Sequence, residues 1–113
     1  MKNNFEIWNE DCIIGAKKIK KESIDLIICD GPFGLGENTF QKHYNRKDNT
    51  LQGYIEAPKD YDKFTLDWMT EAYRILKEDG SMYIISSWSN LSSFYKAIEK
   101  LELIEINHVN GIQ

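Results

Sequence analysis

The sequence predicts an α/β fold in which a partial parallel β-sheet is flanked by helices. Two short apolar runs, at residues 24–29 and 81–86, are typical of strands that are buried on both faces of a sheet. Two amphipathic segments, at 60–78 and 90–101, have the apolar spacing of helices. Because strands alternate with helices along the chain, the sheet is expected to be parallel with right-handed crossovers.

Length and composition set the limits of the prediction. The chain has 113 residues, of which 42% are hydrophobic and 28% charged, as in an ordinary single globular domain with a modest core. It has neither a signal-peptide segment nor an apolar run long enough to cross a membrane, so we expect a cytoplasmic protein without membrane contact. The net charge of -4 neither indicates nor excludes nucleic-acid binding.

The cysteines and histidines predict neither a disulfide nor a metal site. Cys12 and Cys29 lie in or beside predicted elements, so we expect them to be reduced thiols of the core. His43 and His108 are far apart in the sequence, and neither cysteine has a CxxC partner.

The first elements are a short strand and a helix. Residues 5–8 alternate apolar and polar, and a helix over 12–21 follows with Asp11 as its N-cap. Its lysines fit a solvated face near the helix C-terminus, and the alternative is a patch that contacts phosphates. The residues expected to face inward are Ile13, Ile14, Ala16 and Ile19, and those expected to face outward are Lys17, Lys18, Lys20 and Lys21.

Residues 34–60 form a long polar connection with several glycines. Loops of this length are uncommon in compact domains and are usually functional or mobile. Two interpretations stay open, namely contact with nucleic acid and an ordinary solvated loop or short helix. The first depends on interspersed cations and aromatic rings: Phe40, His43, Tyr44, Arg46, Lys47 and Tyr54.

The second half of the chain gives the clearest periodicity. The helix at 60–78 carries an apolar stripe that should face the core, and Gly80 should end it. A strand at 81–86 follows, then residues 87–90 cap the helix at 90–101, and a last strand alternates over 103–109. The apolar residues of the first helix are Tyr61, Phe64, Trp68, Met69, Ala72, Tyr73, Ile75 and Leu76, and those of the second are Leu91, Phe94, Tyr95, Ile98 and Leu101.

Polar groups follow three of the predicted strands, in the segments Asn9-Glu10-Asp11, Asp30-Gly31-Pro32-Phe33 and Ser86-Ser87-Trp88. Parallel strands place their carboxyl ends on one edge of the sheet, where α/β proteins bind ligands. We therefore expect these three segments to lie close together and to form a functional site.

The second segment predicts a site for a planar amine. The Asp30 carboxylate and the Gly31 carbonyl offer two acceptors for the two hydrogens of an amino group, Pro32 fixes the turn, and Phe33 can stack on a ring. An amine on a nucleobase is a poor nucleophile, because its lone pair is delocalised; holding both hydrogens favours the pyramidal, more nucleophilic form. The alternative is a plain Gly-Pro turn capped by Asp30.

The tetrapeptide resembles the Asp-Pro-Pro-Tyr/Phe motif of DNA amino-methyltransferases, which methylate N6 of adenine or N4 of cytosine. Similarity to this family extends through residues 9–12, 22–34 and 73–84, together with Trp68, and so covers nearly the whole chain. The resemblance implies a Rossmann-like fold, S-adenosylmethionine as methyl donor, and double-stranded DNA with a flipped target base as partner.

The resemblance also implies roles for single residues. Asp30, Gly31, Pro32 and Phe33 would be catalytic, and Asp11, Cys12 and Asp30 would bind the cofactor. The Asp11 carboxylate would accept from the cofactor's adenine amino group near the Cys12 N–H; its alternative role is the helix cap, and one aspartate could do both. Gly31 stands where the family has a proline, so the loop gains freedom that costs about 1 kcal/mol to freeze.

The domain expected over residues 1–113 is the amino-terminal, catalytic-motif half of a methyltransferase. Enzymes of this order carry a Phe-x-Gly-x-Gly cofactor loop and a target-recognition region further along, and this sequence has neither. Three functions stay open. The first is a site-specific DNA methyltransferase, of restriction–modification type, completed by a second chain or homo-oligomer; the second is a silent binding or oligomerisation module; the third is methylation of RNA or a protein amide.

Overall fold

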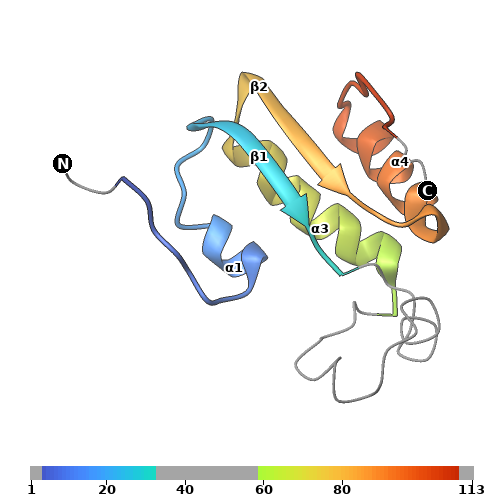
Figure 1. Ribbon diagram of the computed structural model, residues 1–113, viewed down its shortest axis with the longest axis horizontal. Coiled ribbons are helices and arrows are strands. Elements are labelled where there is room, and N and C mark those ends of the chain that lie inside the picture. The colour runs from blue at the N-terminus through green and yellow to red at the C-terminus, as the bar shows by residue number, and fades with distance from the viewer. Residues whose placement is uncertain (1–3, 33–58, 110–113) are drawn as a thin grey trace.

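The computed structural model describes residues 4–32 and 59–109. The elements are α1 (Cys12–Ala16), β1 (Ile24–Asp30), α3 (Tyr61–Ile75), β2 (Leu76–Ile85), the 3-10 turn η2 (Trp88–Asn90) and α4 (Leu91–Leu101). Figure 1 shows β1 and β2 side by side, with α3 running behind them between α1 and α4. No helix within the described ranges is long and apolar enough to cross a membrane.

The two strands confirm the expected parallel pairing. Their register runs from Leu26 opposite Ser81 to Asp30 opposite Ile85, with an irregularity near Ile24. The carboxyl ends of β1 and β2 therefore lie at the same edge of the sheet. This two-stranded parallel sheet with helices is compatible with the predicted α/β fold.

The core lies between α3, α4 and one face of the sheet. Met69, Phe94 and Ala97 form its buried centre, and Trp68 packs edge-on against Phe94 with ring centroids 6.3 Å apart. The predicted apolar stripes of both helices are largely confirmed. They are wrong for Tyr73 and Tyr95, which are 48% and 41% exposed at the margins of their helices.

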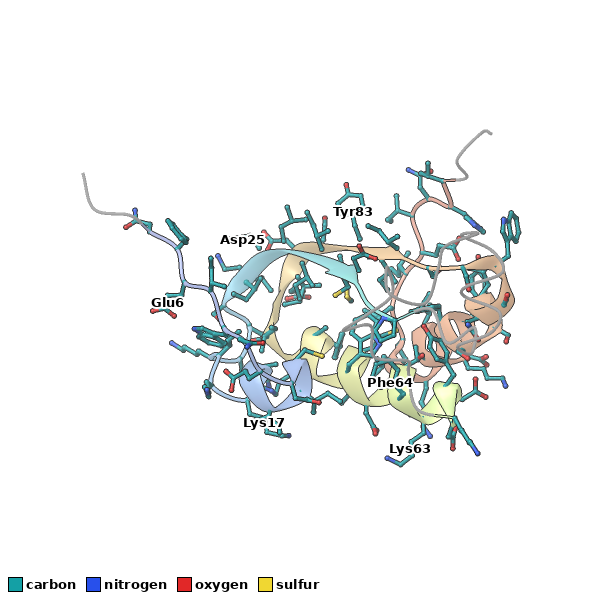
Figure 2. All side chains as sticks on the ribbon, turned by 60° about the horizontal axis from the view of Figure 1, so that its bottom comes forward. Glu6, Lys17, Asp25, Lys63, Phe64 and Tyr83 are labelled. Carbon is teal, nitrogen blue, oxygen red and sulfur yellow. The ribbon has the colours of Figure 1, made fainter. Side chains whose placement is uncertain are left out.

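The expectation that both strands are buried on both faces is wrong. Side chains alternate between the two faces of a strand, and the helices lie on one side of the sheet only (Figure 2). On the other face four apolar side chains are at least half exposed: Leu26 51%, Ile28 67%, Tyr83 64% and Ile85 50%. We call these four residues the bare sheet face.

Two predicted strands, at 5–8 and 103–109, are not strands in the structure. An alternating apolar pattern makes a strand only where the backbone pairs with a neighbour, and among the residues described β1 and β2 pair with each other alone. The side chains of Ile7, Ile104 and Ile106 are accordingly more than 80% exposed.

The first helix is shorter than predicted and ends at Ala16 rather than near residue 21. The chain tightens after it, because Lys18 and Ile19 donate to carbonyls three residues back, at 3.0 and 2.9 Å. Glu22 then adopts a left-handed conformation with φ 52°, which turns the chain into β1. Of the residues expected to face inward, Ile14 is 60% exposed.

The boundary after α3 also differs from prediction. The chain becomes extended at Leu76, and Gly80 lies inside β2 instead of ending the helix. The reason is a close approach of the two strands. A Cβ at Gly80 would lie 2.7 Å from Leu76 Cδ1 and 3.0 Å from the Asp25 carbonyl, so only glycine fits without a shift.

Candidate active site

Two of the three predicted polar segments meet at the carboxyl edge of the sheet. Asp30 is the last residue of β1 and pairs with Ile85, the last residue of β2. The peptide that follows Asp30 and the Ser86-Ser87 segment therefore leave neighbouring strands at the same level. Trp88 begins η2 beyond them and is 73% exposed.

The third segment reaches this edge through α1. The pKa of the Cys29 thiol is raised to about 11, first by burial and second by the negative charge of Cys12. Cys12, in the first turn of α1, therefore lies near Cys29, the residue before Asp30. The structure thus brings the Asp30 and Ser86 segments together at one edge, while a single site formed by all three segments stays a prediction.

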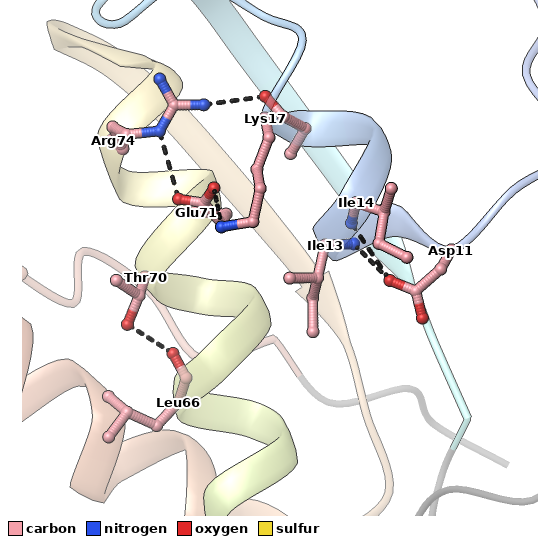
Figure 3. A network of polar contacts seen from close by, with 9 residues as sticks. Asp11, Ile13, Ile14, Lys17, Leu66, Thr70, Glu71 and Arg74 are labelled. Atoms are coloured by element: carbon pink, nitrogen blue, oxygen red, sulfur yellow. Dashed lines mark hydrogen bonds and ion pairs between the residues drawn. The ribbon is translucent and has the colours of Figure 1, made fainter.

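Asp11 is the predicted N-cap of α1. Its Oδ1 accepts hydrogen bonds from the N–H groups of Ile13 at 2.8 Å and Ile14 at 3.2 Å (Figure 3). Both of these bonds go to one oxygen, and the residue is exposed. The cap therefore leaves Oδ2 with lone pairs that can accept from a ligand.

Cys12 is exposed, so its assignment to the core is wrong, whereas Cys29 is half-buried. Both are free thiols. Desolvation of the sulfur and then the negative charge of Asp11 raise the pKa of Cys12. The first turn of α1 thus presents a thiol beside the Asp11 carboxylate.

Asp30 and Gly31 present the two predicted acceptors. Both are exposed, and a Cβ built at Gly31 would meet nothing within 4 Å. The carboxylate and the carbonyl are thus open to a ligand at the strand end. Phe33 and the aromatic and cationic residues of the 34–60 connection lie outside the described residues, so the stacking of Phe33 and the role of the loop stay predictions.

One contact at this turn was missed by sequence reasoning. The Tyr61 hydroxyl donates to the Pro32 carbonyl at 2.8 Å in a partly buried position. Tyr61 had been assigned to the core alone. The available signal was its hydroxyl, since a tyrosine in an apolar stripe needs a polar partner for that group.

A network of ion pairs fixes α1 against α3 (Figure 3). Glu71 accepts from Lys17 at 3.2 Å and from Arg74 at 3.1 Å, while Arg74 donates to the Ala16 carbonyl at 2.8 Å. Desolvation alone would raise the pKa of Glu71, but the bonds from Lys17 and Arg74 outweigh it and lower that pKa. The network holds the helix that carries Asp11 and Cys12.

Two of the four lysines predicted to face outward from the first helix have acidic partners within the chain. Besides the Lys17–Glu71 pair, Lys18 lies 2.7 Å from Glu10. These pairs favour the solvated-face interpretation over a phosphate-contacting patch. In the described part of the chain, no group of three or more His, Cys, Asp or Glu side chains could hold a metal ion.

Comparison with known proteins identifies relatives of this chain. A profile of the N6/N4 family, described as DNA methylase, matches residues 24–111. The chain is 35% identical over 92 residues to the type II methyltransferase M.HpaI of Haemophilus parainfluenzae, covering 80% of this chain and 26% of that protein. It is 39% identical over 89 residues to the DNA adenine methyltransferase YhdJ of Escherichia coli K12, covering 75% and 26%.

A third relative is the type II methyltransferase M.HinfI of Haemophilus influenzae, 32% identical over 108 residues, or 91% of this chain and 30% of that protein. The chain spans between a quarter and a third of the length of these relatives. The family profile, by contrast, matches well over half of this chain, from β1 to beyond α4. The chain therefore belongs to the N6/N4 DNA methylase family.

Proposed function

We propose that this chain provides the amine-holding part of a site-specific DNA methyltransferase. The reaction would transfer a methyl group from S-adenosylmethionine to the exocyclic amine of adenine (N6) or cytosine (N4). The observation that carries the proposal is the pair of exposed acceptors, Asp30 and Gly31, at the carboxyl edge of the sheet beside the α1 N-terminus. Membership of the family supports the same conclusion.

In this reaction the Asp30 carboxylate and the Gly31 carbonyl accept hydrogen bonds from the two N–H groups of the target amine. These two hydrogen bonds favour a pyramidal nitrogen. Its lone pair is then less delocalised into the ring and can point toward the methyl group. As the new C–N bond forms, the bond between the methyl carbon and the sulfur of S-adenosylmethionine would break and S-adenosylhomocysteine would leave. The nitrogen would then lose one proton, and the Asp30 carboxylate, already hydrogen-bonded to the amine, is its proposed acceptor. Pro32 limits the turn, and Phe33 is proposed to stack on the base.

The residues present fit one end of the cofactor. S-adenosylmethionine, when bound, supplies the activated methyl group. The free Oδ2 of Asp11 can accept from its adenine amino group, and the N–H of Cys12 belongs to the first helical turn, whose donors have no partner within the helix. Asp30 is proposed to contribute from the opposite side.

Double-stranded DNA is the proposed partner, with the target base flipped out of the helix. An exocyclic amine in a base pair uses one hydrogen for pairing, so both hydrogens become available to Asp30 and Gly31 only after the base leaves the stack. The relatives M.HpaI and M.HinfI are named as type II methyltransferases. We extend that restriction–modification role to this chain as part of the proposal, together with completion by a second chain or a homo-oligomer.

The test is a chimera in which this chain replaces the matching segment of the Escherichia coli relative. The chimera is incubated with labelled S-adenosylmethionine and duplex DNA, and in parallel with RNA, and the products are digested to nucleosides for mass spectrometry. We expect N6-methyladenine or N4-methylcytosine in DNA, and its loss in the Asp30→Ala variant but not in Asp79→Asn. A folded chimera without transfer to DNA would contradict the proposal, and transfer to RNA alone would redirect it.

The bare sheet face favours a second candidate, a silent binding or oligomerisation module. Its four residues present adjoining apolar side chains from both strands, and soluble proteins rarely leave such patches uncovered without an interaction. The two candidate functions predict different effects of Asp30→Ala. A module would tolerate Asp30→Ala without loss of its association, because Asp30 lies at the end of this face and contributes a carboxylate and not apolar area to it.

A further inference from the structure

The side chain of Tyr61 connects the first turn of α3 to the turn that ends β1. Its hydroxyl donates to the Pro32 carbonyl at 2.8 Å, across 29 positions of sequence. The bond is partly buried, so water competes with it less than at a fully exposed site. It joins the helix to the residue directly after the Gly31 carbonyl.

The core fixes the position of this hydroxyl. The Tyr61 ring meets Phe94 edge-on at 6.1 Å and lies against Phe64 at 5.8 Å. Phe94 is only 6% exposed and belongs to the buried centre of the molecule. Asp60 caps the same turn by accepting from the Lys63 N–H at 3.0 Å. The hydroxyl is therefore presented by a packed ring on a capped helix.

Among the residues that the structure describes, few surround the turn at Gly31. Gly31 has no side chain, and its surroundings are open, since a Cβ there would touch nothing within 4 Å. Glycine has more backbone freedom than any other residue, whereas the ring of Pro32 fixes the φ angle of Pro32. A bond that holds the Pro32 carbonyl therefore removes freedom from the Gly31 peptide, whose carbonyl is one of the two proposed acceptors.

We propose that Tyr61 is a positioning residue for the amine-holding turn. Its hydroxyl anchors the Pro32 carbonyl to α3, and this anchor keeps the Gly31 carbonyl and the Asp30 carboxylate at a spacing that fits one amino group. The catalytic meaning of this anchor depends on the proposed function, but its effect on the turn does not. Tyr61 would compensate for the freedom that Gly31 introduces.

The first test measures backbone order in the 15N-labelled full chain by NMR relaxation. Tyr61→Phe removes the hydroxyl and keeps the ring, and Tyr73→Phe on the same helix is the matched control. We expect the order parameter of the Gly31 N–H to fall from about 0.85, typical of rigid backbone, to below about 0.6 in Tyr61→Phe. Tyr73→Phe should leave the order parameter of Gly31 unchanged. The order parameter of Ile27, in the middle of β1, should stay the same in both variants.

The second test asks whether a stiffer turn replaces the anchor. Gly31→Ala fits the open space and reduces backbone freedom, so Tyr61→Phe/Gly31→Ala should recover part of the lost order at residue 31. In the chimera described above, Tyr61→Phe should lower kcat about tenfold, as the loss of one well-placed hydrogen bond predicts. The KM for S-adenosylmethionine should change less than kcat, because two of its three proposed contacts, Asp11 and Cys12, lie at the N-terminus of α1 and not on the turn.

Two results would overturn the proposal. One is an unchanged order parameter at Gly31 in Tyr61→Phe; the other is an equal fall at Ile27, which would mean that the hydroxyl supports the whole fold and not this turn. An unchanged kcat with a loosened turn would refute the catalytic part. A wild-type chimera without activity would count against the methyltransferase proposal alone, since the relaxation data decide the role of Tyr61 without turnover.

Discussion

Asp30, Gly31, Asp11 and Cys12 are all exposed, yet the elements that carry them are fixed by groups lying behind them. Asp30 ends a strand paired with β2, and Asp11 caps a helix with two hydrogen bonds. Exposure leaves the functional atoms open to a ligand, while the backbone positions them. The Tyr61–Pro32 bond extends the same arrangement to the turn after Asp30.

The thiols of Cys12 and Cys29 should differ in their rate of alkylation. The thiolate is the reactive form, and burial followed by the Cys12 charge raises the pKa of Cys29 to about 11. At pH 8 iodoacetamide should therefore modify the exposed Cys12 well before Cys29, and the rate at Cys29 should keep rising with pH up to about 11.

Mass spectrometry of Cys12→Ser and Cys29→Ser would follow each site separately. The pKa of Cys12 is raised too, by desolvation and by Asp11, so its rate at pH 8 should stay below that of an unperturbed cysteine. Equal rates at the two sites at pH 8 would contradict this description of the strand end.

At the scale of elements, α1 is a helix of five residues that depends on α3 for its position. So short a helix is not stable by itself, and in proteins tertiary contacts supply most helical stability. Here the contacts are ionic. Glu71 is bonded to both Lys17 and Arg74, and Arg74 also binds the last carbonyl of α1.

Replacing Arg74 should loosen α1. Arg74→Met keeps the apolar stem but removes one donor from the Ala16 carbonyl, which keeps the Ile19 N–H, and one from Glu71, which keeps Lys17. We expect this to cost about 1–2 kcal/mol in the free energy of unfolding. Urea denaturation followed by circular dichroism would measure the cost. Lys63→Met is the control, because its pair with Asp67 is within one helix and exposed, and it should change stability little.

Asp62 joins α3 to α4 and makes this contact sensitive to acid. Hydrogen bonds from Lys96 and then from the buried Ser93 lower the pKa of Asp62. A carboxyl with a lowered folded pKa adds stability above its ordinary pKa of 3.8, and that stability disappears as the pH falls through the lower folded value. Because Asp62 is half exposed, the effect should be small.

We therefore expect Lys96→Met to move the acid unfolding transition to higher pH, while Lys100→Met, on the same helix, leaves it in place. The acid midpoint would be read from tryptophan fluorescence between about pH 2 and 6, the range around an ordinary carboxyl pKa. Identical midpoints for the two variants would show that the Asp62 contact does not contribute to stability.

At the scale of the whole molecule, the helices within residues 4–32 and 59–109 cover the sheet on one side only. Ile28 and Tyr83 are cross-strand partners in the register, and both are more than 60% exposed on the bare sheet face. Apolar surface of this kind, next to strand edges with unpaired backbone groups, favours association with another protein surface.

The full chain by itself should therefore self-associate as its concentration rises. Ile28→Thr keeps a β-branched side chain in the strand but lowers its apolar area, and should weaken dimerisation about tenfold, the effect of losing one or two buried methyl groups. Sedimentation velocity would measure this, with Tyr73→Gln on the helical side as control. A chain that stays monomeric at all concentrations would show that this face needs no cover.

Local sequence was enough to identify most of the elements and to predict the acceptors of the site. The periodicity of α3 and α4, the parallel pairing of β1 and β2, and the Asp11 cap each depend on neighbours in sequence or on a general topological rule. The prediction that Asp30 and Gly31 are acceptors follows from their chemistry and from their place at a strand end. The family relationship could be identified from the same residues.

Tertiary structure alone decided which patterns became strands and which faces were covered. Residues 5–8 and 103–109 carry strand-like alternation, but backbone hydrogen bonds need a partner that no local pattern supplies. The local sequence around Gly80 predicts the end of a helix. In the structure the Asp25 carbonyl lies 3.0 Å from where a Cβ would be, so Gly80 allows the close approach of two strands. The Tyr61–Pro32 bond and the Arg74–Ala16 bond link residues 29 and 58 positions apart. Sequence determined what each residue can bind, and only packing decided which partner it meets, because such contacts depend on how distant segments come together.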